Sequence, residues 1–251
     1  MRRILLMAAV AAVALSGQVQ AQPNPVSTAN IAAAVSDKGR PEADTKRDAD
    51  RKPAEMLAFA EVKPGEKVAD LLPGGGYFTR IFAKAVGPSG KVYAVIGAAQ
   101  AKANPPPAVN AIATDPLYGN IAVVAADFPA VALPEPVDLI WTSQNYHDLH
   151  LKARNLDVAA VNRAVFAALK PGGLFVVLDH AAAPGSSLDS ADAVHRIDPA
   201  IVKAEVEAAG FKFEGEDTAL RNLTDDHTKP VFDPSIRGHT DQFIYKFRKP
   251  K

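Results

Sequence analysis

The chain of 251 residues contains no cysteine, so it forms no disulfide and offers no thiolate as a nucleophile, a metal ligand or a lipidation site. It also lacks net charge, because 28 lysine and arginine residues balance 28 aspartate and glutamate residues. Without a uniform positive field, nothing draws the protein to nucleic acid or to an anionic membrane surface. We therefore expect small molecules or other proteins as its partners.

Long hydrophobic runs are absent as well. One apolar run, Ile4–Leu15, follows Arg2-Arg3 and precedes Val19-Gln20-Ala21, but it is too short to span a bilayer comfortably. This pattern predicts a secretory signal peptide over residues 1–21, removed by cleavage, and hence a periplasmic or secreted protein with no membrane span after cleavage. The alternative is an N-terminal membrane anchor.

The rest of the chain is apolar enough for a folded domain, since 48% of all residues are hydrophobic. Residues 22–52 are polar and charge-rich, and we interpret them as an N-terminal extension or lid. Pro53 suits the first position of a helix that continues to Ala60. We therefore expect the folded domain to span residues 53–251.

Apolar runs rich in β-forming residues alternate with helical patterns along this domain, which indicates a parallel sheet with helices on both faces. The expected strands are Lys67–Leu72, Lys91–Ile96, Ile121–Ala125, Val137–Thr142 and Gly173–Leu178, followed by Phe211–Glu216 and Gln242–Arg248. The expected helices include Tyr77–Val86, Asp157–Leu169 and one that begins at Asp198-Pro199 and ends at Gly210. The last two strands suit a closing antiparallel hairpin.

A glycine turn, Asp70–Gly76, lies where the first strand is expected to end and a helix to begin. In open α/β sheets, ligands bind beyond the carboxyl ends of the strands. Three consecutive glycines remove every Cβ from the turn, so that a ligand reaches the backbone N–H groups at the helix start. We predict a ligand site here. The alternative is a tight strand-to-helix turn without a ligand.

Several strings together resemble the class I S-adenosylmethionine-dependent methyltransferases. The acid and glycines of Asp70–Gly76 are similar to the first motif of that family, and Asp127-Phe128 resembles the acidic and aromatic pair after its third strand. Val137–Ser143 is similar to its fourth strand, and Leu169–Phe175 to the turn into its fifth. The resemblance runs from about Val62 to Arg248, which is most of the chain.

The resemblance implies a Rossmann-like methyltransferase fold, with a mostly parallel seven-stranded sheet and a closing antiparallel hairpin. It also implies methyl transfer from S-adenosylmethionine to a small-molecule acceptor. The cofactor-binding residues that it implies are Asp70, Gly74, Gly75, Gly76, Tyr77, Asp127, Phe128, Ser143 and Asn145. Within the family, the chain is most similar to a group of exported bacterial proteins labelled as methyltransferases, which share the string Pro73–Arg80.

The sequence departs from the family pattern at two places. Leu72 stands where the family has its first glycine, and Ile96-Gly97 stands where it has a ribose-binding acid. Gln100 is a neutral candidate for the role of that acid, although its hydrogen bonds are weaker than those of a carboxylate. A non-catalytic binding protein that retains the fold is therefore the alternative function. A nicotinamide dinucleotide enzyme fits less well, because Thr79 stands where that fingerprint expects a glycine.

A dense polar run, Ser143–His150, follows the fourth expected strand and lies beside the predicted ligand site. His147 is a candidate general base because imidazole titrates near neutral pH, and Asp148 or Asp179 would orient it. Together with Tyr146, His147 and Asp148 are the candidate catalytic residues. The alternative is that His147 only shapes the pocket, while alignment of the reactants lowers the barrier.

The remaining histidines and arginines are not assigned to the predicted site. We predict no metal ion, because the histidines near Asp148 lack the i, i+4 spacing of a helical metal motif and a thiolate partner. Arg80 and His195-Arg196 are candidate partners of anionic groups or, alternatively, ordinary surface residues.

Overall fold

The structure, a computed structural model, describes residues 25–251. The predicted signal peptide, residues 1–21, lies outside this range. Among the described residues, no helix is both long and apolar enough to cross a membrane.

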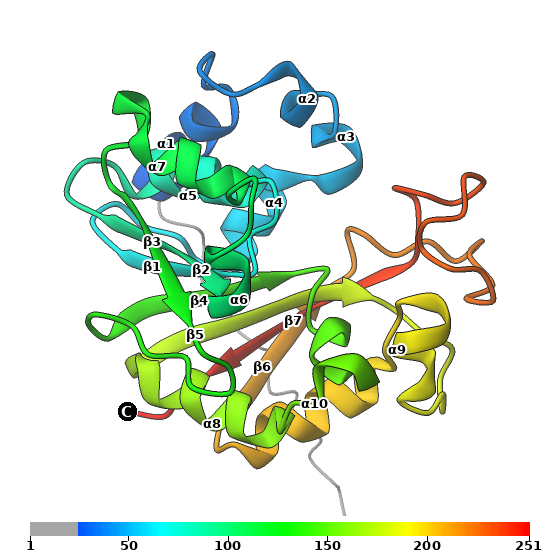
Figure 1. The fold of residues 1–251 in the computed structure, drawn as a ribbon. Coiled ribbons are helices and arrows are strands. Elements are labelled where there is room, and N and C mark those ends of the chain that lie inside the picture. Colours follow the sequence, from blue (N-terminus) through cyan, green and yellow to red (C-terminus); the bar gives the residue numbers. More distant parts are fainter. Residues whose placement is uncertain (1–24) are drawn as a thin grey trace, which may run out of the picture.

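A seven-stranded sheet forms the centre of the molecule, in the order β3-β2-β1-β4-β5-β7-β6 (Figure 1). The strands are β1 (Lys67–Leu71), β2 (Lys91–Gly97), β3 (Ile121–Ala126), β4 (Val137–Ser143), β5 (Leu169–His180), β6 (Lys212–Asp217) and β7 (Gln242–Arg248). Only β7 runs against its neighbours, and it pairs with both β5 and β6. The predicted α/β fold, mostly parallel with an antiparallel closing pair, is confirmed.

Helices cover both faces of the sheet, because the central strands bury side chains on both sides. On β4, Trp141 packs into one apolar core and Ile140 into the other. The first core lies under α1 (Pro25–Val35), α4 (Pro53–Phe59), α5 (Tyr77–Val86) and α7 (Ala108–Thr114), and the second under α8 (Val158–Ala168) and α10 (Pro199–Ala208). Figure 1 shows these two layers above and below the sheet.

Four short helices complete the part of the chain that the structure describes: α2 (Glu42–Thr45), α3 (Asp48–Arg51), α6 (Ala98–Ala101) and α9 (Asp189–Val194). Three single 3-10 turns lie at Pro116–Tyr118, His147–His150 and Lys152–Arg154. The longest irregular stretch within residues 25–251, residues 218–241, connects β6 to β7.

The segment that we assign to an N-terminal extension packs closely on the domain from residue 25 onwards. Ile31 and Ala34 of α1 are buried in the first core, where α1 lies against α5. Beyond α1, the fully buried side chain of Arg40 forms an ion pair of 2.7 Å with Asp48 of α3. These contacts hold α2 and α3 at the edge of the sheet where β1 and β4 end.

Candidate functional site

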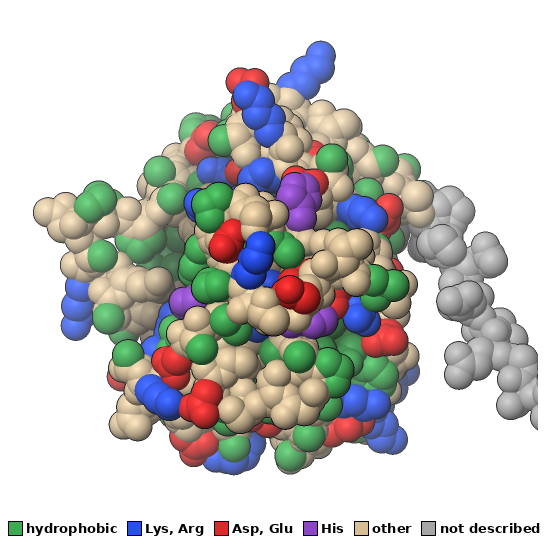
Figure 2. Space-filling view, turned by 90° about the vertical axis from the view of Figure 1, so that its right-hand side faces the viewer, with side chains coloured by type: hydrophobic (Ala, Val, Ile, Leu, Met, Phe, Trp, Pro, Cys, Tyr) green, Lys and Arg blue, Asp and Glu red, His purple; other side chains and the backbone are tan. Residues whose placement is uncertain are grey.

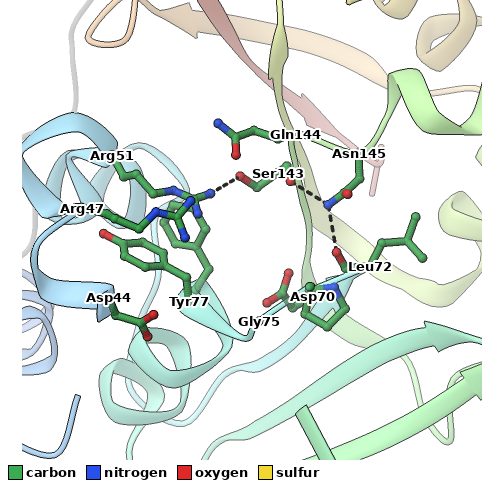
Figure 3. A pocket seen from close by; sticks show the side chains of 13 residues that line it. Asp44, Arg47, Arg51, Asp70, Leu72, Gly75, Tyr77, Ser143, Gln144 and Asn145 are labelled. Carbon is green, nitrogen blue, oxygen red and sulfur yellow. Dashed lines mark hydrogen bonds between the residues drawn. The ribbon is translucent and has the colours of Figure 1, made fainter. Parts of the chain in front are cut away.

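A cavity of about 220 Å³ lies beyond the carboxyl ends of β1 and β4. Three parts of the chain form its walls: the glycine turn after β1, the residues that follow β4, and the segment of α2 and α3 (Figure 3). Cavities that bind small ligands in open α/β sheets lie at this edge. The position of the cavity therefore agrees with that of the predicted ligand site.

The three glycines of the turn differ in their surroundings. A Cβ added to Gly74 or Gly75 would have no atom within 4 Å, and both residues line the cavity. A Cβ on Gly76 would lie 2.3 Å from Cδ1 of Ile112, so this glycine lets α7 pack closely against the turn. Gly76 also has a positive φ of 78°. Two glycines thus keep the cavity open and the third serves packing.

Asp70, at the end of β1, brings a buried carboxyl group to the cavity. Its Oδ2 accepts a hydrogen bond of 2.6 Å from the hydroxyl of Thr79. Burial raises the pKa of Asp70 to about 7, although the bond from Thr79 and the charge of Arg51 both act to lower it. The carboxyl group of Asp70 is therefore poised to ionise near neutral pH when a cation approaches.

Two arginines of the N-terminal segment, Arg47 and Arg51, form the opposite wall. The guanidinium of Arg51 lies 4.4 Å from the ring centre of Tyr77 and donates a hydrogen bond of 2.9 Å to Oγ of Ser143 (Figure 3). Burial and the nearby charge of Arg47 lower the pKa of Arg51 to about 10, so it stays charged at neutral pH. Sequence reasoning missed Asp44 and both arginines, whose only signal was the charge-rich composition of residues 22–52.

Arg80, on α5, ties the glycine turn to this N-terminal wall. Its Nη1 donates to the carbonyl oxygen of Gly75 at 3.0 Å and lies 2.7 Å from Oδ2 of Asp44. From the sequence, Arg80 is a candidate partner of an anionic ligand group. In this structure its guanidinium holds two walls of the cavity together.

The backbone is strained where β1 and β4 end. Leu72 and Gln144 have left-handed φ values of 53° and 61°. The side-chain amide of Asn145 donates to the carbonyl oxygens of Leu72, at 2.9 Å, and Ser143, at 2.6 Å, and so fixes the two strand ends together. Strain of this kind in residues other than glycine concentrates at functional sites.

The structure brings together six of the predicted cofactor-binding residues around the cavity: Asp70, Gly74, Gly75, Tyr77, Ser143 and Asn145. Gly76, Asp127 and Phe128 do not line it. Phe128 lies instead against a narrow apolar gap of about 10 Å³ on the other side of Leu72. The side-chain oxygen of Gln100 accepts a hydrogen bond of 3.0 Å from the N–H of Gly97 and caps α6.

The candidate catalytic residues lie behind the cavity rather than in its wall. The hydroxyl of Tyr146 is buried and contacts Glu205 at 2.9 Å and Asn162 at 2.7 Å. His147 is also buried, and its Nδ1 lies 2.8 Å from Oδ1 of Asp179. Its other ring nitrogen, Nε2, lies 3.3 Å from Oδ1 of Asp148.

The two carboxylates determine the charge of His147. Burial alone would lower its pKa, but the charge of Asp179 and the hydrogen bond to Asp148 outweigh this and raise the pKa to about 10. At neutral pH the ring is therefore an imidazolium that donates to both carboxylates. A ring in this state has no lone pair with which to remove a proton from a substrate.

Comparisons with known proteins support the fold. No protein-family model and no curated protein sequence matches the chain. Among solved structures, it is similar to a SAM-dependent methyltransferase from Aquifex aeolicus, with 17% identity, a TM-score of 0.58, and 83% of this chain and 95% of that chain covered.

Two further solved structures are similar over comparable lengths. The 1,6-didemethyltoxoflavin-N1-methyltransferase of Burkholderia thailandensis, solved with S-adenosylhomocysteine, has 17% identity and a TM-score of 0.56, with 84% of this chain and 82% of that chain covered. The [4+2]-cyclase SpnF has 15% identity and a TM-score of 0.61, with 85% of each chain covered. These matches show that the chain has the fold of class I methyltransferases, and that a [4+2]-cyclase has a similar fold.

Proposed function

We propose that the protein binds S-adenosylmethionine in the cavity at the glycine turn and transfers its methyl group to a small-molecule acceptor. The open space in front of Gly74 and Gly75, at the start of α5, is the observation that carries this proposal. Solved methyltransferases of the same fold support it, because that of Aquifex aeolicus is SAM-dependent and that of Burkholderia thailandensis binds S-adenosylhomocysteine.

The residues around the turn suit the end of the cofactor that carries the ammonium, carboxylate and sulfonium groups. Asp70 supplies a buried carboxyl group for a cationic ammonium or sulfonium, and Arg47 and Arg51 supply positive charge for a carboxylate. Ser143 and Asn145 offer polar side chains beside them. When bound, S-adenosylmethionine would supply a methyl group activated by the positive sulfur, so the protein has only to align the acceptor and exclude water.

In this proposal, His147 and its neighbours position the site and do not remove a proton. The imidazolium of His147 links Asp148 to Asp179 of β5, while Tyr146 links the same turn to α8 and α10 through Asn162 and Glu205. Both sets of contacts fix the residues that immediately follow Asn145. The acceptor would therefore be a group that attacks without prior deprotonation, or one that loses its proton to solvent.

The alternative function is a non-catalytic binding protein. It is supported by the end of β2, where Ile96-Gly97 offers no carboxylate for a ribose and Gln100 is already engaged with the backbone of Gly97. The cyclase of the same fold supports it as well, because the fold alone does not determine methyl transfer. Under this alternative, the cavity holds a different metabolite.

Calorimetric titration of the full mature chain with S-adenosylmethionine and S-adenosylhomocysteine tests the cofactor. We expect each to bind with one molecule per chain. If neither binds at millimolar concentration, the methyltransferase proposal is wrong. If both bind, transfer of a labelled methyl group to a mixture of small metabolites then distinguishes the enzyme from the binding protein.

We also propose that the protein acts outside the cytoplasm, after removal of residues 1–21. The support is the sequence pattern of Arg2-Arg3, the apolar run and Val19-Gln20-Ala21. The mass of the chain recovered from a periplasmic extract checks this. A mass that still includes the first 21 residues would contradict cleavage.

A further inference from the structure

A cluster of three potential metal ligands lies behind the cavity, among residues that do not line it. His147 and Asp148 lie on the 3-10 turn after β4, and His195 directly follows α9. One ligand atom of each lies within 4.8 Å of the others. Figure 2 looks onto the side that carries α9 and shows histidine side chains exposed between acidic and basic ones.

We propose that Nε2 of His147, Oδ1 of Asp148 and Nδ1 of His195 form a binding site for a divalent transition metal ion, with Zn²⁺ as the best match. Binding of the ion displaces the proton of Nε2 to solvent, so that the lone pair of this nitrogen binds the metal while Nδ1–H stays on Asp179. Two imidazoles and one carboxylate are a ligand set typical of zinc sites that keep a fourth position open to water. The proposal is independent of whether S-adenosylmethionine binds.

The distances suit a tetrahedral ion. Bonds of about 2.0–2.1 Å at tetrahedral angles place neighbouring ligand atoms roughly 3.3 Å apart. Nε2 of His147 lies 3.3 Å from Oδ1 of Asp148, and Nδ1 of His195 lies 3.9 Å from the same oxygen. A small rotation of the His195 side chain, which is 31% exposed, would complete the set.

Surrounding contacts already orient the first two ligands. Asp179, which is fully buried, accepts from the backbone N–H of His147 at 2.7 Å and lies 2.8 Å from its Nδ1, so the ring presents Nε2 to the cluster. Carboxylates in this position are typical second partners of metal-binding histidines. Arg154 donates to Oδ2 of Asp148 at 3.1 Å and leaves Oδ1 facing the two rings.

The backbone also holds the third ligand in place. His195 has a left-handed φ of 54°, an uncommon conformation for a residue with a side chain. The next residue, Arg196, is buried in an ion pair of 2.8 Å with Asp225 and donates its N–H to the carbonyl of Ser190 at 3.3 Å. The loop therefore presents His195 from a fixed base, and its ring packs edge to face against those of Phe232 and His147, with 4.9 and 5.5 Å between ring centres.

Titration of the full, untagged mature chain with Zn²⁺ alone tests the site by calorimetry, and substitution by Co²⁺ gives the visible absorption of a tetrahedral site. We expect one bound ion per chain. Asp148→Asn and His195→Ala should each weaken binding at least about tenfold, and Asp179→Asn by about 10- to 100-fold. The side chains of Asp148 and His195 are partly exposed, so Asp148→Asn and His195→Ala are expected to fold and carry the test if Asp179→Asn does not.

His239→Ala is the matched control, because His239 is an exposed histidine, with 67% of its side chain accessible, that lies near the carboxylate of Asp50. This variant should bind Zn²⁺ as tightly as the parent. Absence of a bound equivalent, or equal affinity in Asp148→Asn, His195→Ala and the parent, would overturn the proposal. So would an equal loss of affinity in the His239 variant.

Discussion

Gly75 and Gly76 are neighbours in one turn, but their surroundings predict different effects of the same substitution. Gly76→Ala should destabilise the protein by about 3 kcal/mol, because the new methyl group meets Ile112 and φ is left-handed. Gly75→Ala should change stability by less than about 0.5 kcal/mol. Since its methyl group points into the cavity, it should weaken S-adenosylmethionine binding about tenfold.

Urea unfolding and calorimetric titration of both variants check this pair. Equal stabilities would show that Gly76 has no special packing role. Unchanged affinity in Gly75→Ala would place the ligand away from the turn.

Asp70 should make the stability of the protein depend on pH in an unusual direction. Burial raises its pKa from 3.8 to about 7, so between these values the folded chain binds a proton that the unfolded chain has released. The contribution of Asp70 to the free energy of unfolding is therefore largest below about pH 4. It falls as the pH rises to about 7 and is constant above that. The full change is of the order of 4 kcal/mol.

Asp70→Asn removes this titration with little change of shape, since the amide oxygen still accepts the hydrogen bond from Thr79. The free energy of unfolding of the parent, measured from pH 4 to pH 8, should fall relative to that of the variant. Parallel curves would show that Asp70 ionises normally in the folded chain.

At the scale of elements, α3 is held by one of its two acidic side chains. Asp48 pairs with the fully buried guanidinium of Arg40 and accepts a hydrogen bond of 2.6 Å from Tyr77, a residue of the cavity wall. Asp48→Ala leaves the buried guanidinium of Arg40 without its carboxylate, and we expect a loss of about 3 kcal/mol. Asp50, on the same helix, is the control because its side chain is 44% exposed.

Chemical unfolding compares the two variants, and hydrogen exchange shows whether α1 to α3 open first in Asp48→Ala. Asp50→Ala should stay within about 0.5 kcal/mol of the parent. Equal effects of the two substitutions would mean that the ion pair with Arg40 does not hold the segment.

Within residues 53–251, the strands and the longest helices could be predicted from the sequence, whereas helices of four residues could not. The bounds of α5 agree with the prediction because its apolar face repeats over ten residues and Gly87 ends it. The helices α2, α3 and α6 have four residues each, too few to show a period. The prediction also began β5 at Gly173, whereas the strand begins at Leu169, with a shift of register beside β4.

At the scale of the whole molecule, a local sequence pattern could predict some walls of the candidate site but not others. The glycine turn and the residues after β4 were accessible to prediction, because parallel strands end at the same edge of a sheet. Arg47 and Arg51 were not, since only the docking of α1 onto α5 brings them to the cavity. His195 lies far along the chain from His147, and no spacing rule joins the two.

The place of β7 has a consequence for how the protein is made. A ribosome synthesises residues 242–248 after every other strand, yet this strand lies between β5 and β6. Until it emerges, the nascent chain has a bare edge on β5, and β6 has no neighbour on which to form. The sheet can therefore close only after residues 242–248 have been synthesised, and a polypeptide that lacks them is the form most exposed to aggregation.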